Sequence, residues 1–200
     1  MNRYTVVAIV LHWAMALGIA ALATMGLVMV HLKLDPMRQF QLYQLHKSIG
    51  ITILLAAALR LGWRLAFRPP PLPGSMPPVE RAAAAGSHLL LYLFLFAVPF
   101  TGWALVSSSV FNIPTVLYGI VPWPDLPILS TLDNKAPVEA ALKHVHARAA
   151  FALIGLVFIH AAAALRHHFI IKDDVLRRML PALPRRKPAA EPARMKEPTL

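Results

Sequence analysis

Cysteine is absent from the 200 residues of this chain. Its absence excludes disulfides, thiolate-bound metals, iron–sulfur clusters and any haem attached covalently through a C-x-x-C-H motif. Acidic residues are also scarce, with nine Asp and Glu against 20 Lys and Arg and a formal net charge of +11. Most of this charge flanks apolar segments, so anionic membrane lipid is a simpler partner than nucleic acid, and we predict no nucleic-acid binding.

Hydrophobic residues make up 58% of the chain, well above the share in soluble domains. The excess lies in four segments, 6–30, 45–63, 87–106 and 147–166. Each approaches the ~20 residues that a helix needs to cross a hydrocarbon core about 30 Å thick. The first runs past the length of a signal-peptide core and is interpreted as a retained helix. The predicted fold is an all-α integral membrane four-helix bundle.

Basic residues predict the orientation of the bundle. Four spans put both termini and the connector between the second and third spans on one side, which holds 14 of the 20 Lys and Arg. The positive-inside rule therefore predicts that the N- and C-termini are cytoplasmic.

The chain divides into two predicted regions, a four-helix transmembrane domain over 1–180 and a basic, proline-rich tail over 181–200 that we expect to be disordered. Between the third and fourth spans a loop of about 35 residues is long enough to pack as a cap on the outer face. After the fourth span the sequence IIKDDVLRRML favours a short interfacial helix.

Histidines within the spans are the strongest functional signal. The last span and its flanks, KHVHARAAFALIGLVFIHAAAALRHHF, hold five of the nine. Helical geometry separates His146 from His160 by about 21 Å along the axis and ~40° around it, whereas His144 faces away from His160. By depth, His12 lies in the inner leaflet with His160, and His46 lies in the outer leaflet with His146.

Two facing histidines at each of two depths suit two six-coordinate haems, because a porphyrin supplies four nitrogens and leaves two axial positions for imidazoles. A single histidine in a membrane is otherwise explained by a hydrogen bond between helices. His88 begins the third span on the inner side and is an alternative to His12 or His160. It is shallower than either, so we expect it to form hydrogen bonds near the inner site.

Several other polar residues have two interpretations each. His167 and His168 either sit at the membrane boundary or, in the case of His167, hydrogen-bond a quinone carbonyl and handle its proton. Arg60 and Arg64 either anchor the second helix or pair with haem propionates. The glycines that recur in the spans serve helix packing or clearance for a flat ligand; they are Gly18, Gly26, Gly50, Gly62, Gly102 and Gly155.

Four stretches in order, RYTVVAIVLHW, HKSIG with LRLGWR, SHLLLYLFLFAVPFTGW and HAAAALRHHFIIKDDVLRRM, resemble the bacterial cytochrome b561 family over residues 3–180. The resemblance implies two non-covalent, bis-histidine haems b with iron ligands at His12, His46, His146 and His160. It also favours His12 over His88 and implies a quinone site that carries over to His167. The implied location is the bacterial inner membrane.

The function implied is electron transfer across the bilayer between the quinone pool and a small-molecule or protein partner on the periplasmic side. One form is superoxide oxidation coupled to ubiquinone reduction, for which Lys47, Lys143 and Arg148 would supply a basic outer surface. An alternative is a cytochrome b subunit that anchors a periplasmic hydrogenase or dehydrogenase. A different class, a histidine-lined metal or proton transporter, predicts buried carboxylates, and none of the nine acidic residues lies within a predicted span.

Overall fold

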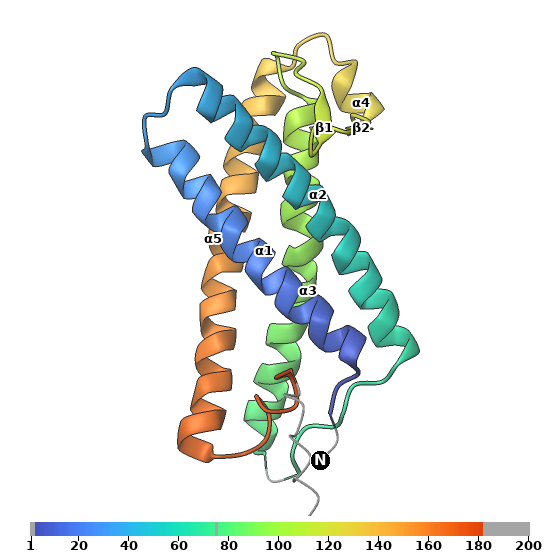
Figure 1. Ribbon diagram of the computed structural model, residues 1–200, viewed down its shortest axis with the longest axis vertical. Helices are drawn as coiled ribbons and strands as arrows, with labels where there is room; N and C mark the ends of the chain where they lie inside the picture. Colours follow the sequence, from blue (N-terminus) through green and yellow to red (C-terminus); the bar gives the residue numbers. More distant parts are fainter. Residues whose placement is uncertain (1–2, 75, 182–200) are drawn as a thin grey trace, which may run out of the picture.

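The computed structural model describes residues 3–74 and 76–181 and consists mainly of four long helices (Figure 1). These are α1 (Val6–His31), α2 (Pro36–Ala66), α3 (Pro78–Ser107) and α5 (Ala136–Arg166), the last of which runs into a short π-helical turn, η1 (His167–Ile171). All four are long and apolar enough to cross a membrane. The predicted all-α membrane bundle is therefore confirmed.

Three of the helices begin well before the apolar segments that predicted them. Helix α2 begins at Pro36 and α3 at Pro78, because proline at the first helical position is already set for helical backbone angles. The Asp35 carboxylate caps α2 by accepting a hydrogen bond from the Arg38 N–H (3.1 Å). Hydropathy marks only the part of each helix in lipid, while backbone hydrogen bonding continues to the nearest cap or proline.

The helices pack in chain order, with α1 against α2, α2 against α3 and α3 against α5. The described core lies among the first three and consists of Met15, Ile53, Ala57 and Leu95. A Cβ atom on Gly18 would lie 2.8 Å from Ile53 Cδ1, so this glycine serves close packing of α1 on α2. Neither α1 nor α2 packs as closely on α5, which leaves side chains to bridge those helices.

Large apolar side chains cover the outside of the bundle. Leu17, Leu89 and Phe158 are each more than 70% exposed and lie on three different spans. Such surfaces are unfavourable in water but match a bilayer core.

One end of the bundle, which we call the terminal end, gathers residues 3–5, the described residues of the connector (67–74 and 76–77) and residues 172–181 (Figure 1). The Trp13 indole N–H donates to the Met179 carbonyl (2.8 Å), and the Arg178 guanidinium donates to the Pro71 carbonyl (2.6 Å). These contacts agree with the predicted placement of both chain ends beside that connector.

The prediction of a short interfacial helix in IIKDDVLRRML is wrong. Lys172 adopts a left-handed backbone (φ 60°) that ends the π turn, and residues 174–180 form turns instead of a helix. An Asp174–Arg178 ion pair (2.8 Å) closes one of these turns, and its hydrogen bond lowers the pKa of the Asp174 carboxyl. Residues 182–200, which include nearly all of the tail predicted to be disordered, lie outside the described residues.

At the opposite end, the loop end, residues 108–135 fold into the predicted cap. The cap contains a two-stranded antiparallel hairpin, β1 (Thr115–Leu117) and β2 (Val121–Trp123), and a single turn, α4 (Pro127–Ser130). Two buried serines attach it to the spans. The Ser48 hydroxyl accepts from the Tyr118 N–H and the Ser107 hydroxyl from the Leu126 N–H, both at 2.9 Å.

We expect Ser48→Ala and Ser107→Ala each to destabilise the cap. Each leaves a cap N–H without its acceptor, at a cost of about 1–3 kcal/mol. Faster proteolytic cleavage within 108–135, with a lower unfolding temperature, is the readout. Ser87→Ala is the control, because the Ser87 hydroxyl bonds only within its own helix, to the Ala84 carbonyl. Unchanged cleavage in both cap variants would contradict this account.

Candidate functional site

Two pairs of histidine rings bridge helices that do not pack closely on each other. His12 of α1 faces His160 of α5 with 6.2 Å between ring centroids, towards the terminal end. His46 of α2 faces His146 of α5 at 6.4 Å, towards the loop end. The two pairs are those expected from helical depth, and α5 supplies one ring to each.

Both separations suit two imidazoles bound to a single metal ion. Two metal–nitrogen bonds of about 2 Å, each with roughly 1.2 Å from nitrogen to ring centroid, place the centroids about 6 Å apart. Among the described residues, no hydrogen bond joins the two rings of either pair. The geometry therefore favours shared ligation.

Helix α3 fixes the His146 ring. Its Nδ1 lies 3.1 Å from the Val98 carbonyl and 3.3 Å from the Thr101 hydroxyl. A carbonyl oxygen only accepts hydrogen bonds, so Nδ1 carries the proton and the neutral ring keeps a free lone pair on Nε2. Metal-binding histidines are commonly oriented in this way, with the second nitrogen donating to a backbone carbonyl.

His12 has a different partner. Arg60 donates to His12 Nδ1 (3.3 Å) and to the Ala8 carbonyl (3.1 Å). Because a guanidinium only donates, this contact places the His12 proton on Nε2. Ligation through Nε2 therefore requires Arg60 to leave Nδ1 for another acceptor.

Glycines make room for the pair at the loop end. A Cβ atom on Gly102 would lie 3.0 Å from Cε1 of His146, and one on Gly26 would lie 3.8 Å from Cε1 of His46. The first distance leaves too little space for a methyl group, while the second is an ordinary contact. Gly50, Gly62 and Gly155 have no atom within 4 Å of such a Cβ. Gly18 thus serves packing, one of the two roles predicted for the glycines, and Gly102 leaves space for the His146 ring. Clearance for a flat ligand stays a prediction.

His88 lies closer to the pair at the terminal end than its sequence position suggested. Its ring centroid is 5.5 Å from that of His160, so α3 brings a third imidazole to the place where α1 and α5 face each other. Depth along the helix could not reveal this contact, because it depends on how closely α3 packs on α5.

At the end of α5 the structure gives His167 a partner that the sequence did not reveal. Its Nδ1 lies 2.6 Å from the Asp173 carboxylate, and both side chains are largely buried. Asp173 returns to His167 because the chain turns at Lys172, and it also accepts from the Val175 N–H (3.0 Å). His144 is exposed, as expected from its helical angle.

The predicted cationic residues lie at both ends. At the terminal end, Arg64 lies over the Tyr92 ring, 5.7 Å from its centroid. At the loop end, Lys47 donates to the Pro114 carbonyl of the cap (3.3 Å), while Lys143 and Arg148 are exposed on α5.

A free metal ion has no matching site in the described part of the chain. No group of three or more His, Cys, Asp or Glu side chains there is arranged to hold one. Two imidazoles suffice only when the ligand brings the remaining donors, as a porphyrin does.

The fold and the paired rings define a membrane four-helix bundle with two facing pairs of histidines between its helices. Comparison with known proteins agrees: the family model for prokaryotic cytochrome b561 matches residues 3–182. Cytochrome b561 homolog 2 of Escherichia coli K12 is 37% identical over 181 residues, which cover 90% of this chain and 92% of that protein. Homolog 1 from the same organism is 27% identical, with coverage of 90% and 98%. A Yersinia pestis protein named probable superoxide oxidase CybB is 26% identical, with coverage of 90% and 97%.

The chain belongs to the prokaryotic cytochrome b561 family. It is therefore a multi-pass bacterial membrane cytochrome of the b type that functions in electron transfer. The predicted resemblance is confirmed.

We expect Gly102→Ala to weaken haem retention about tenfold. This is the lower end of the loss in affinity expected when the group that orients a metal-binding histidine is disturbed. The added methyl group would push the His146 ring away from the Val98 carbonyl. Haem absorbance per protein during repeated washing in detergent measures this. Gly26→Ala is the matched control and should retain haem like the wild type. Equal retention in both variants would show that Gly102 is not needed for clearance.

Proposed function

We propose that this protein binds two non-covalent haems b and transfers electrons across the bilayer between the quinone pool and a partner on the periplasmic side. The haem near the terminal end is held by His12 and His160, and that near the loop end by His46 and His146. The observation that carries the proposal is the matched separation of the two ring pairs, 6.2 and 6.4 Å.

The residues present fit this cofactor. Haem iron supplies the one-electron redox chemistry when bound. The chain supplies the rest: four imidazoles, a carbonyl that fixes one tautomer, and apolar helices that exclude water. His146 and His160 lie 14 positions apart on one helix, about 21 Å in rise, so the two sites stand in different leaflets.

Arg60 and Arg64 are proposed to pair with the propionates of the haem near the terminal end. A carboxylate is a stronger partner for guanidinium than a neutral imidazole nitrogen. Pairing with a propionate would draw Arg60 away from His12 Nδ1 and leave that ring free to ligate through Nε2. One exchange of partners thus supports both assignments.

The quinone is proposed to bind near His167, at the terminal end. With Asp173 holding Nδ1–H, the Nε2 atom of His167 is left to face a ligand (2.6 Å between Nδ1 and Oδ2). The Asp173 carboxylate orients the ring, whose Nε2 atom can then exchange a proton with a quinone carbonyl. Reduction to the quinol consumes two electrons and two protons, and His167 would deliver a proton.

Superoxide is the proposed donor that the comparisons favour, because one relative is named a probable superoxide oxidase. Two superoxide anions would each give one electron and leave as dioxygen, matching the two electrons taken up by ubiquinone. Lys47, Lys143 and Arg148 lie towards the loop end and would attract the anion. The proposed orientation has the loop end in the periplasm and both termini in the cytoplasm, in the bacterial inner membrane.

Replacing a ligand should remove one haem selectively. His46→Ala and His146→Ala should lose the haem near the loop end, while His12→Ala and His160→Ala should lose the other. Each variant is expected to keep about half of the haem per chain, because each site retains its own pair of ligands. Pyridine haemochrome assay against protein concentration measures the ratio, and a ratio of one haem per chain in the wild type would refute the two-site scheme.

His88→Ala tests the competing ligand of His160. If His12 is the ligand, the His88 variant keeps both haems and its reduced spectrum remains bis-histidine. Loss of one haem in the His88 variant, with retention in the His12 variant, would reverse the assignment.

His167→Gln should slow ubiquinone reduction by the pre-reduced protein about 100-fold, the loss typical of removing a general acid. Asp173→Asn should slow it less, because an amide oxygen can still accept from Nδ1–H and keep the His167 ring in place. Stopped-flow oxidation of the reduced haems by ubiquinone measures both rates. Asp174→Asn, which removes the adjacent carboxylate, is the control. Reduction of ubiquinone at the wild-type rate in the His167 and Asp173 variants would rule out the His167–Asp173 pair as proton donor.

A further inference from the structure

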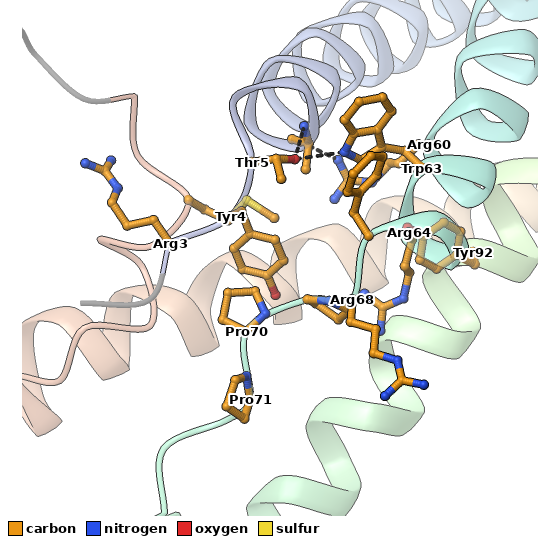
Figure 2. Close-up of a pocket in the computed structure, with 14 residues that line it drawn as sticks. Arg3, Tyr4, Thr5, Arg60, Trp63, Arg64, Arg68, Pro70, Pro71 and Tyr92 are labelled. Carbon is orange, nitrogen blue, oxygen red and sulfur yellow. Dashed lines mark hydrogen bonds between the residues drawn. The ribbon is translucent and has the colours of Figure 1, made fainter.

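A cavity of about 460 Å³ at the terminal end is lined by four arginines and no acidic residue. The arginines are Arg3, Arg60, Arg64 and Arg68. Figure 2 shows Arg60, Arg64 and Arg68 at the end of α2 and Arg3 apart from them, with the prolines of the connector below and Thr5 hydrogen-bonded to the Trp63 indole (2.8 Å) above.

Three of these arginines follow one another at intervals of four residues. Arg60 and Arg64 lie within α2, and Arg68 lies just beyond its end at Ala66. Like charges at this spacing repel each other. Elsewhere arginines of this chain are neutralised, as in the pairs Arg38–Asp35, Arg166–Glu80 and Arg178–Asp174. Within the described residues, Arg60, Arg64 and Arg68 have no such carboxylate partner.

The charges in the cavity exceed what the haem can neutralise. One haem brings two propionates, whereas four arginines line the cavity, so two positive charges are left over. Arg60 is the deepest, since it reaches His12, and Arg68 is the furthest along the chain towards the surface. The surplus therefore lies at the mouth of the cavity.

The mouth is at the level where lipid headgroups lie. Helix α1 begins at Val6 and α2 ends at Ala66, and Tyr4, Trp63 and Tyr92 line the same cavity. Aromatic residues of this kind gather at the membrane interface. Basic pockets between transmembrane helices bind acidic headgroups, because guanidinium groups match phosphate oxygens in pairs.

We propose that this cavity binds the phosphate of an anionic lipid headgroup, with Arg68 as the principal cation. The site adjoins the haem near the terminal end, and the surplus of charge rests on the proposed pairing of Arg60 and Arg64 with its propionates. It would give the protein a fixed lipid at the terminal end, where the connector meets residues 172–181.

The test uses the haem-loaded protein in nanodiscs of equal parts phosphatidylglycerol and phosphatidylcholine. Native mass spectrometry after gentle extraction counts the lipids retained by the wild type, Arg68→Gln and Arg81→Gln. Arg81 is exposed near the start of α3 and does not line the cavity, so its variant loses the same charge elsewhere. The wild type and the Arg81 variant should retain phosphatidylglycerol, and the Arg68 variant should retain about fivefold less, since an arginine near the surface contributes about a factor of five.

A second arm separates a lipid from a soluble anion. In detergent, added phosphatidylglycerol should raise the unfolding temperature of the wild type more than inorganic phosphate does, and phosphatidylcholine should have no such effect. Equal retention by the wild type and the Arg68 variant, equal loss in the two variants, or equal stabilisation by inorganic phosphate would each overturn the proposal. The haem absorption spectrum should be the same in all three proteins, so failure here is distinct from failure of haem binding.

Discussion

The structure depends on the burial of imidazole rings between helices that cross the membrane. A polar ring without a partner is costly in hydrocarbon, so each ring must be paired by the fold. Helix α5 carries one ring of each pair, His160 and His146, while α1 and α2 supply the other two. Because α5 packs closely on α3 alone, these rings bridge helices whose backbones stay apart, as a planar ligand between them would require.

The remaining helix, α3, supports the site from behind. Its Val98 carbonyl fixes the tautomer of His146, and Gly102 gives that ring the space it needs. Near the terminal end the same helix adds His88 beside His160. One helix thus orients a histidine ring at one depth and adds a third imidazole at the other.

The two ends of the bundle differ in construction. The loop end is closed by a hairpin that buried serines hold to α2 and α3. The terminal end has a cavity lined by arginines and prolines, and it also holds the His167–Asp173 pair. The two ends are therefore closed in different ways.

The sequence by itself determined the membrane class, the four spans and the two histidine pairs, because hydropathy and a fixed rise per residue are local properties of a helix. It placed His88 near the inner site but could not show which ring His88 would meet. It did not bring Asp173 to His167, and it wrongly predicted a helix where Lys172 turns the chain. Tertiary packing decided those contacts, since they depend on the distance between helices and on a single left-handed residue. Periodicity fixes the direction a side chain takes from its own helix, and only the packed bundle fixes what it meets.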